Sequence, residues 1–156
     1  MTPSTAPLRR LVIRLATVVA MVVATLAATL AVALPAQARS ATAGEGYVRL
    51  DDTCTGLGFT NRVRNQQVAS GLTLRVYYSS SQGGTNCVNL VNTSGRTRDI
   101  GVVVFADGGR SYALDEGRYS SFAGSVLVKD VAGECIDLQW RVDGSWRPRI
   151  FDQHCG

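Results

Sequence analysis

The residues best placed to do chemistry stand at the end of the chain, in the segment 151–156 (FDQHCG). It sets the only histidine, His154, beside the last cysteine, Cys155. Such a pair could be a nucleophile and its base, two metal ligands, or a disulfide anchor with a neighbouring histidine. Adjacent residues of an extended strand point to opposite faces, so His154 and Cys155 would face apart if this segment is a strand. The disulfide anchor is therefore the favoured interpretation, and His154 is expected to be a surface residue.

The four cysteines support that interpretation. An even count in a short exported chain is typical of disulfides, and no two of these cysteines have the close C-x-x-C spacing of a zinc site. Four cysteines allow three pairings. We favour Cys54–Cys87 and Cys135–Cys155, because a turn near residues 143–144 would bring Cys135 close to the end of the chain. No metal, cofactor or catalytic residue is predicted.

The first 38 residues have the pattern of a signal peptide. Residues 1–14 carry three arginines and no acid, residues 15–34 are uncharged, and small residues follow Pro35 at Ala36 and Ala38. We expect cleavage after Ala38, with the second A-x-A at Ala43 as the alternative site. An uncleaved membrane anchor is the competing interpretation, since twenty apolar residues can span a bilayer. Cleavage would yield an extracellular protein without membrane contact.

Removal of this leader changes the charge of the protein. Three of the 16 basic residues lie in it and none of the 12 acidic residues do, so residues 39–156 keep 13 basic residues and a net charge of +1. No basic block remains that could neutralise a run of phosphates. Nucleic acid is therefore not an expected partner.

The remaining chain reads as one β domain. Residues 39–46 are small and polar and predict a flexible N-terminal segment, followed by a single domain over residues 47–156. Residues 72–78 alternate apolar and polar side chains as a half-buried strand does, and with 87–92 they predict a hairpin. Further strands are predicted at 99–105 (a central strand), 111–114, 119–122, 125–128 and 136–142, the last followed by a turn at Asp143 and Gly144. This pattern predicts an all-β antiparallel sandwich or barrel with two disulfides.

Three aromatic residues are candidates for ligand contacts. Trp140 alternates with Ile136 and Leu138, so we expect it to pack in the core. Trp146 follows a turn, and Tyr77 lies opposite the apolar face of its strand. Trp146 and Tyr77 are therefore the predicted ligand surface, as expected of a glycan-binding module.

Acidic residues offer weaker hypotheses. His154 with a glutamate base and an arginine would suit a small secreted hydrolase, the glutamates being Glu45, Glu116 and Glu134. The adjacent acids at 51–52 and 115–116 could suggest glycoside hydrolysis. Adjacent acids in polar turns are usually solvated, so we interpret both pairs as loop residues.

The C-terminal segment 132–156 resembles the spore-associated protein A family of sporulating actinobacteria. The resemblance rests on C-[VI]-D at residues 135–137, G-x-W at 144–146 and H-C-G at 154–156, with an upstream Y-x-S-S…N-C-V pattern that includes Cys87. One departure is Leu138, where the family has a tryptophan. The resemblance implies an exported protein of the spore or cell surface and brings no catalytic residue.

These observations predict an exported, non-enzymatic protein that binds or supports components of the spore or cell surface. The alternative is a secreted inhibitor of a protease or another hydrolase, which would present the loops at 79–86 or 141–148. A small hydrolase that uses His154 and a glycan-binding module are the remaining hypotheses.

Overall fold

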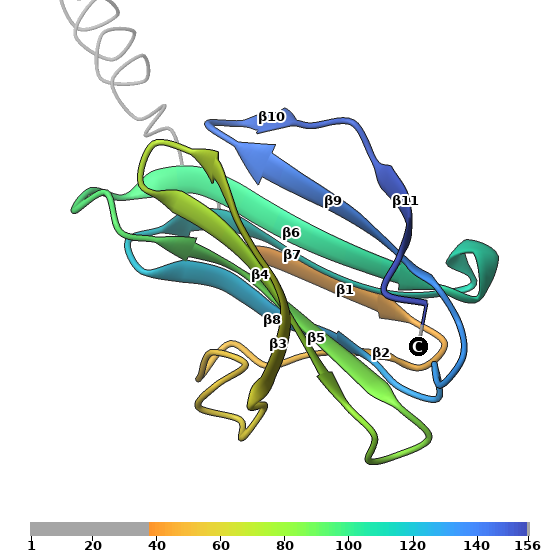
Figure 1. Ribbon diagram of the computed structural model, residues 1–156. Coiled ribbons are helices and arrows are strands. Elements are labelled where there is room, and N and C mark those ends of the chain that lie inside the picture. Colours follow the sequence, from red (N-terminus) through yellow and green to blue (C-terminus); the bar gives the residue numbers. More distant parts are fainter. Residues whose placement is uncertain (1–37, 156) are drawn as a thin grey trace, which may run out of the picture. The chain divides into compact units, whose positions relative to one another are not determined.

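The computed structural model describes residues 38–155, which form two antiparallel β-sheets (Figure 1). The expected signal peptide, apart from Ala38, lies outside the described residues. In chain order the elements are β1 (Arg39–Ala43), β2 (Gly46–Val48), β3 (Asn61–Ala69), β4 (Leu72–Ser79), β5 (Thr85–Asn92), β6 (Arg98–Ala106), the 3-10 helix η1 (Asp107–Gly109), β7 (Ser111–Tyr119), β8 (Phe122–Val128), β9 (Ile136–Val142), β10 (Ser145–Trp146) and β11 (Ile150–Gln153).

The strands divide between two sheets that enclose one core. The first, here the β6 sheet, has the order β1-β7-β6-β9-β10, with β11 also paired to β9. The second, the β5 sheet, has the order β2-β8-β5-β4-β3. Their inward faces contribute aliphatic side chains to a common core, among them Leu74 and Leu90 from the β5 sheet and Val102 and Leu138 from the β6 sheet. The predicted all-β, disulfide-stabilised fold is confirmed as a sandwich.

Alternating residues form the strands that the pattern predicts. On β4, Leu72, Leu74 and Val76 are fully buried, and β4 pairs with β5 from Leu72 opposite Asn92 to Ser79 opposite Thr85. Strand β6 lies between β7 and β9, which confirms it as a central strand. Strand β9 turns at residues 143–144 into β10, as predicted.

Two local predictions are wrong. Residues 39–46 are not a flexible segment, because β1 pairs with β7 from Arg39 opposite Glu116 to Ala43 opposite Tyr112. Small polar side chains suffice there, since an edge strand is held by backbone hydrogen bonds and needs little apolar surface. Residues 119–122 are not a strand: β7 runs to Tyr119, and the chain turns before β8 begins at Phe122.

Strand β3 was not predicted at all. Its sequence, NRVRNQQVA, is almost entirely polar, and most of its side chains are exposed. It forms the edge of the β5 sheet beside β4, with two register shifts. Polar and charged residues with bulges are common on edge strands, where they discourage pairing with other chains.

Both predicted disulfides are present. Cys54 is bonded to Cys87 of β5, and Cys135, just before β9, is bonded to Cys155, just after β11. The second links the two ends of the β9–β11 segment. The first attaches residues 49–60, here called the Cys54 loop, to the outer face of the β5 sheet.

Candidate functional site

The Cys54 loop covers a row of side chains on the outer face of the β5 sheet. Strand pairing aligns Tyr47, Leu127, Cys87 and Tyr77 across four neighbouring strands. Leu127, Cys87 and Tyr77 join Cys54 in a second apolar cluster, separate from the main core. The outer face of this sheet is therefore apolar where the loop crosses it.

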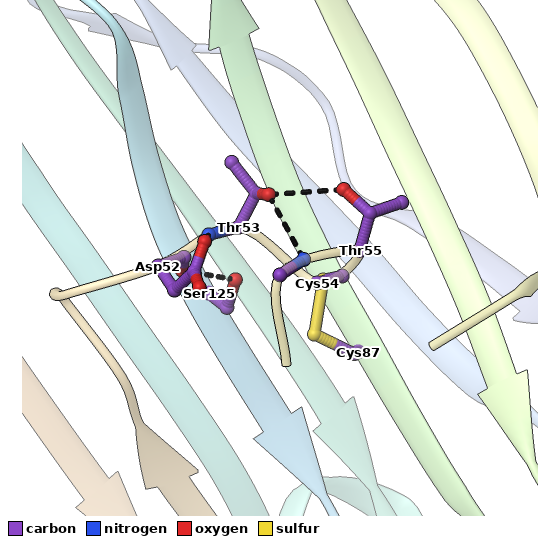
Figure 2. Close-up of a disulfide and its surroundings, with 7 residues drawn as sticks. Asp52, Thr53, Cys54, Thr55, Cys87 and Ser125 are labelled. Carbon is purple, nitrogen blue, oxygen red and sulfur yellow. Dashed lines mark hydrogen bonds between the residues drawn. A yellow bond between two sulfur atoms is a disulfide. The ribbon is translucent and has the colours of Figure 1, made fainter. Parts of the chain in front are cut away.

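Short-range hydrogen bonds give the Cys54 loop its shape (Figure 2). The amide of Leu57 donates to the carbonyl of Thr53 at 3.0 Å, and the amide of Phe59 donates to the carbonyl of Cys54 at 3.0 Å. The Thr53 and Thr55 hydroxyls lie 3.0 Å apart, and the Ser125 hydroxyl of β8 donates to the Asp52 carbonyl at 3.0 Å. The disulfide and the Ser125 contact attach the loop to the sheet, and the bonds within the loop hold its own turns.

Two shallow hollows lie on either side of Phe59, and we call them together the Phe59 site. One, of about 280 Å³, is lined by Phe59, Asn61, Tyr78 and nearby serine hydroxyls. The other, of about 220 Å³, is lined by Tyr47, Arg49, Phe59 and polar residues of the loop between β4 and β5. Aromatic rings among hydroxyl and amide groups are suited to binding a polar ligand with apolar faces.

Tyr47 closes one side of this site. The Lys129 ammonium lies over the Tyr47 ring, 4.6 Å from the ring centre, which is a favourable contact between a cation and an aromatic face. Burial raises the pKa of Tyr47 above the ordinary tyrosine value, against the smaller opposing effect of Arg49. The hydroxyl is therefore protonated, and able to donate a hydrogen bond, throughout the neutral range.

The predicted ligand surface is not assembled. Tyr77 is only 3% exposed, because the Cys54 loop covers the face on which it lies, and it packs beside the disulfide. Trp146 is 36% exposed but belongs to β10 of the other sheet. It pairs with Arg141, so it lies on the outward face of that sheet rather than on the face of Ile136. Trp140 packs half-buried against the main core, as expected.

Sequence reasoning missed Phe59, Tyr47 and Tyr78. Tyr47 and Phe59 belong to no alternating pattern, and Tyr78 falls on the apolar parity of its strand, so the sequence marks none of them as a ligand contact. Each becomes part of the site through a distant segment. The one usable signal was Cys54, because a disulfide to a predicted strand implies that its flanking residues lie on a sheet face.

The pair His154 and Cys155 does not form a nucleophile and its base. Cys155 is in a disulfide, so it has no thiolate. His154 follows β11 with a φ of 51°, so the local chain is not extended and the expected strand geometry does not apply. The ring is half-buried, and Nε2 is buried with no hydrogen-bond partner among residues 38–155. Burial, with a smaller contribution from Arg64, lowers the pKa of His154.

The acid pair at 115–116 is not a loop pair. Both residues lie on β7 and point to opposite faces, Asp115 fully buried and Glu116 outward. Glu116 accepts a hydrogen bond from Arg141 and contacts Arg39 at 3.2 Å. Its carboxylate is therefore occupied by two guanidinium groups and is separated in space from Asp115.

Glu116 is also remote from His154. Glu116 aligns with Arg141 at one end of β9, whereas His154 follows Gln153, which pairs with Ile136 at the other end. Five residues of strand span roughly 16 Å. The geometry therefore does not assemble Glu116 and His154 into an acid and base pair.

Both loops considered for an inhibitor are tight turns. Gln82, Gly83 and Gly84 have consecutive positive φ angles of 52°, 67° and 88°. Asp143 and Gly144, at 47° and 82°, form the two-residue turn of a hairpin. The middle of each loop is therefore a turn between two paired strands, β4 and β5 in the first loop and β9 and β10 in the second.

Within residues 38–155, no group of three His, Cys, Asp or Glu side chains is placed to hold a metal ion. The same residues contain no helix with the length and apolarity to cross a membrane. Comparisons with protein-family models, curated proteins and solved structures give no match.

Proposed function

We propose that this chain is an exported, non-enzymatic binding protein of a spore or cell surface, and that the Phe59 site is its ligand contact. The observation that carries the proposal is the Phe59 site itself, a surface of aromatic, hydroxyl and amide groups fixed by a disulfide. Because the loop is attached to a sheet at Cys87, its side chains lose little conformational freedom when a ligand binds.

Export is the second part of the proposal. The leader pattern in residues 1–38 supports it, and two disulfides suit an oxidising compartment outside the cytoplasm. The resemblance to spore-associated protein A supports the spore or cell surface as the location. The cysteines that carry that resemblance are the ones that form the two disulfides.

Retention on washed cells tests this function. The mature protein is added to washed cells and spores, and the bound fraction is measured by sedimentation. We expect binding that saturates and that Phe59→Ala reduces at least about fivefold, since a ring that contacts ligand contributes roughly 1 kcal/mol or more. Phe59→Leu keeps apolar volume under the loop but removes the aromatic face, so it should show a similar loss with an unchanged fold.

Phe151→Ala is the matched control. Phe151 is a phenyl group that is 61% exposed on β11 of the other sheet, so its removal should leave retention unchanged. Recovery of the wild-type protein only in the fluid would contradict the proposal. Equal retention of wild type and both Phe59 variants would show that the Phe59 site is not the contact.

A further inference from the structure

Charged residues are divided unequally between the two sheets. Among the described residues, the five strands of the β5 sheet contain no aspartate or glutamate, and their charged residues are Arg62, Arg64 and Arg75. The β6 sheet holds acidic residues on β6, β7, β9 and β11. No acid occurs anywhere between Thr53 and Arg98. The nearly neutral molecule therefore has one cationic sheet.

Two of these arginines belong to a polar outer face. Arg75 lies between the buried Leu74 and Val76, so its side chain points away from the core. Strand pairing sets Arg75 between Asn65 of β3 and Asn89 of β5, and sets Thr73 beside Gln67 in the next row. Together with Arg62, these residues form what we call the β3–β5 face: Arg62, Asn65, Gln67, Thr73, Arg75 and Asn89.

The β3–β5 face has hydrogen-bonding capacity that the protein does not use. Asn89 is 1% exposed, and its Oδ1 is buried with no partner among the described residues. The Nε of Arg75, its neighbour across the strands, is likewise buried without an acceptor. Buried polar groups in native proteins are nearly always satisfied by protein or by ordered water, so this donor and this acceptor are open to a solvent or ligand partner.

Most arginines on the β6 sheet are paired with acids, with Arg118 of β7 as an exception among the described residues. Arg98, Arg141 and Arg149 each contact a carboxylate at 3.0 Å or less. On the β5 sheet, Arg64 donates instead to Gln66 and Gln153. In the described part of the chain, Arg62 and Arg75 have no carboxylate within salt-bridge distance. The β3–β5 face therefore presents two guanidinium groups that no acid of this protein neutralises.

We infer that the β3–β5 face binds an anionic polysaccharide. A guanidinium group matches the geometry of a carboxylate or phosphate, and the amides of Asn65 and Gln67 and the hydroxyl of Thr73 can bond to sugar hydroxyls. The face lacks the large apolar side chains that anchor most protein interfaces. An acidic glycan therefore fits it better than an acidic protein.

The β3–β5 face is continuous with the Phe59 site. Arg62 directly follows Asn61, which lines the hollow beside Phe59, and it pairs with Tyr77 under the Cys54 loop. A polymer that contacts the Phe59 site can therefore extend along β3. The inference rests in this respect on the proposed function and names its ligand class.

Binding of defined polymers tests the inference. The probes are polygalacturonate, which carries carboxylates, a glycerol phosphate polymer, which carries phosphates, and neutral dextran. We expect the mature protein to bind one or both acidic polymers with affinity that falls as salt rises, and to bind dextran at least tenfold more weakly. The acidic polymer that binds more tightly identifies which anion the face recognises.

A pair of double variants with equal charge loss separates this face from net charge. Arg62→Gln with Arg75→Gln should weaken binding roughly tenfold or more, because two charge-assisted contacts are lost. Arg118→Gln with Arg147→Gln removes two arginines from the β6-sheet side, and it should change binding less than about twofold. Unchanged thermal unfolding of both double variants verifies that the fold is intact. Equal losses in the two double variants, or equal binding of dextran, would overturn the inference.

Cell retention distinguishes failure of this inference from failure of the proposed function. Retention that depends on Phe59 while polymer binding ignores Arg62 and Arg75 would leave the proposed function in place and refute the β3–β5 face. Polymer binding that depends on Arg62 and Arg75, without retention on cells, would support the face and refute the surface location.

Discussion

Asp115 shows how a single residue joins the two sheets. Its carboxylate, which has no exposed surface, accepts hydrogen bonds from the Ser40 hydroxyl at 2.9 Å, the Tyr119 hydroxyl at 2.7 Å and the Gly124 amide at 2.8 Å. Gly124 belongs to β8 of the opposite sheet, at a register shift against β5. Gly124 has a φ of 83°, which residues with a side chain rarely adopt. A Cβ at this position would also lie only 2.9 Å from the carbonyl oxygen of Val88. The bulge thus supplies the free amide that a buried carboxylate requires.

Replacement of Asp115 should therefore destabilise the fold in a graded way. Asp115→Ala leaves an amide and two hydroxyls without an acceptor and should lower the free energy of unfolding by about 2–4 kcal/mol. Asp115→Asn should cost less, about 1–2 kcal/mol, because the amide can rotate and the two hydroxyls can reorient to accept from it. Urea unfolding measures both. A loss in the Asn variant as large as in the Ala variant would contradict this account.

His154 should make stability depend on pH in the weakly acidic range. Burial and the Arg64 guanidinium lower the pKa of His154 in the fold, so the unfolded chain binds the proton more readily. Stability contributed by the neutral ring is complete above 6.5, the ordinary pKa of histidine, and declines as pH falls below it. Melting temperatures between pH 7 and pH 5 should fall more for the wild type than for His154→Gln. Parallel curves would count against this effect.

The Cys54 loop and the β9–β11 segment are two elements held by one disulfide each. Each disulfide closes a loop of 33 or 20 residues and stabilises the fold by about 3–4 kcal/mol in the chain-entropy model. Only the first borders the Phe59 site. The two disulfides therefore have similar effects on stability and different effects on binding.

Paired cysteine variants should separate these effects. Cys54→Ala with Cys87→Ala should lower stability and abolish retention on cells, because the loop that carries Phe59 is no longer attached to β5. Cys135→Ala with Cys155→Ala should lower stability by a comparable amount and keep retention at a temperature where the protein stays folded. Denaturant unfolding and sedimentation with cells measure the two properties. Full retention by the first variant would show that the loop holds its shape without the disulfide.

At the scale of the whole molecule, the two expected cleavage sites differ in whether the mature chain keeps β1, and the β6 sheet is complete only with β1 present. Strand β1 covers the edge of β7, with Arg39 beside Glu116 and Ser40 donating to Asp115. Cleavage after Ala38 keeps this strand, whereas cleavage after Ala43 removes it. A chain that begins at residue 44 exposes the β7 edge and loses a hydrogen bond to the buried carboxylate.

A chain of residues 44–156 should be less stable than one of residues 39–156 by about 2–4 kcal/mol, the sum of several backbone and side-chain hydrogen bonds. Thermal unfolding of the two chains checks this, and the intact mass of the secreted protein identifies its first residue. We expect Arg39. A mature chain that begins at Gly44 with equal stability would show that β1 is dispensable.

Local patterns in the sequence were enough for several features of this protein. Alternation at residues 72–78 and 136–142 determined two strands and their buried faces, because the side-chain direction in a strand depends only on neighbouring residues. The Asp143-Gly144 turn determined a hairpin for the same reason. Four cysteines behind a leader-like segment predicted two disulfides, and alternation with turns every few residues predicted an all-β fold.

Other features depend on contacts between residues far apart in the chain, and only the tertiary structure decided them. Tyr77 points away from the main core, as its pattern implies, yet it is buried because the Cys54 loop lies over it. Asp115 reads as a loop acid until the bulge at Gly124 supplies its amide. Arg62 and Arg75 gain significance only when pairing sets them on a sheet without acids, whereas Arg98, Arg141 and Arg149 are paired with carboxylates. Burial and charge pairing are properties of the space around a side chain, and only the assembled sheets define that space.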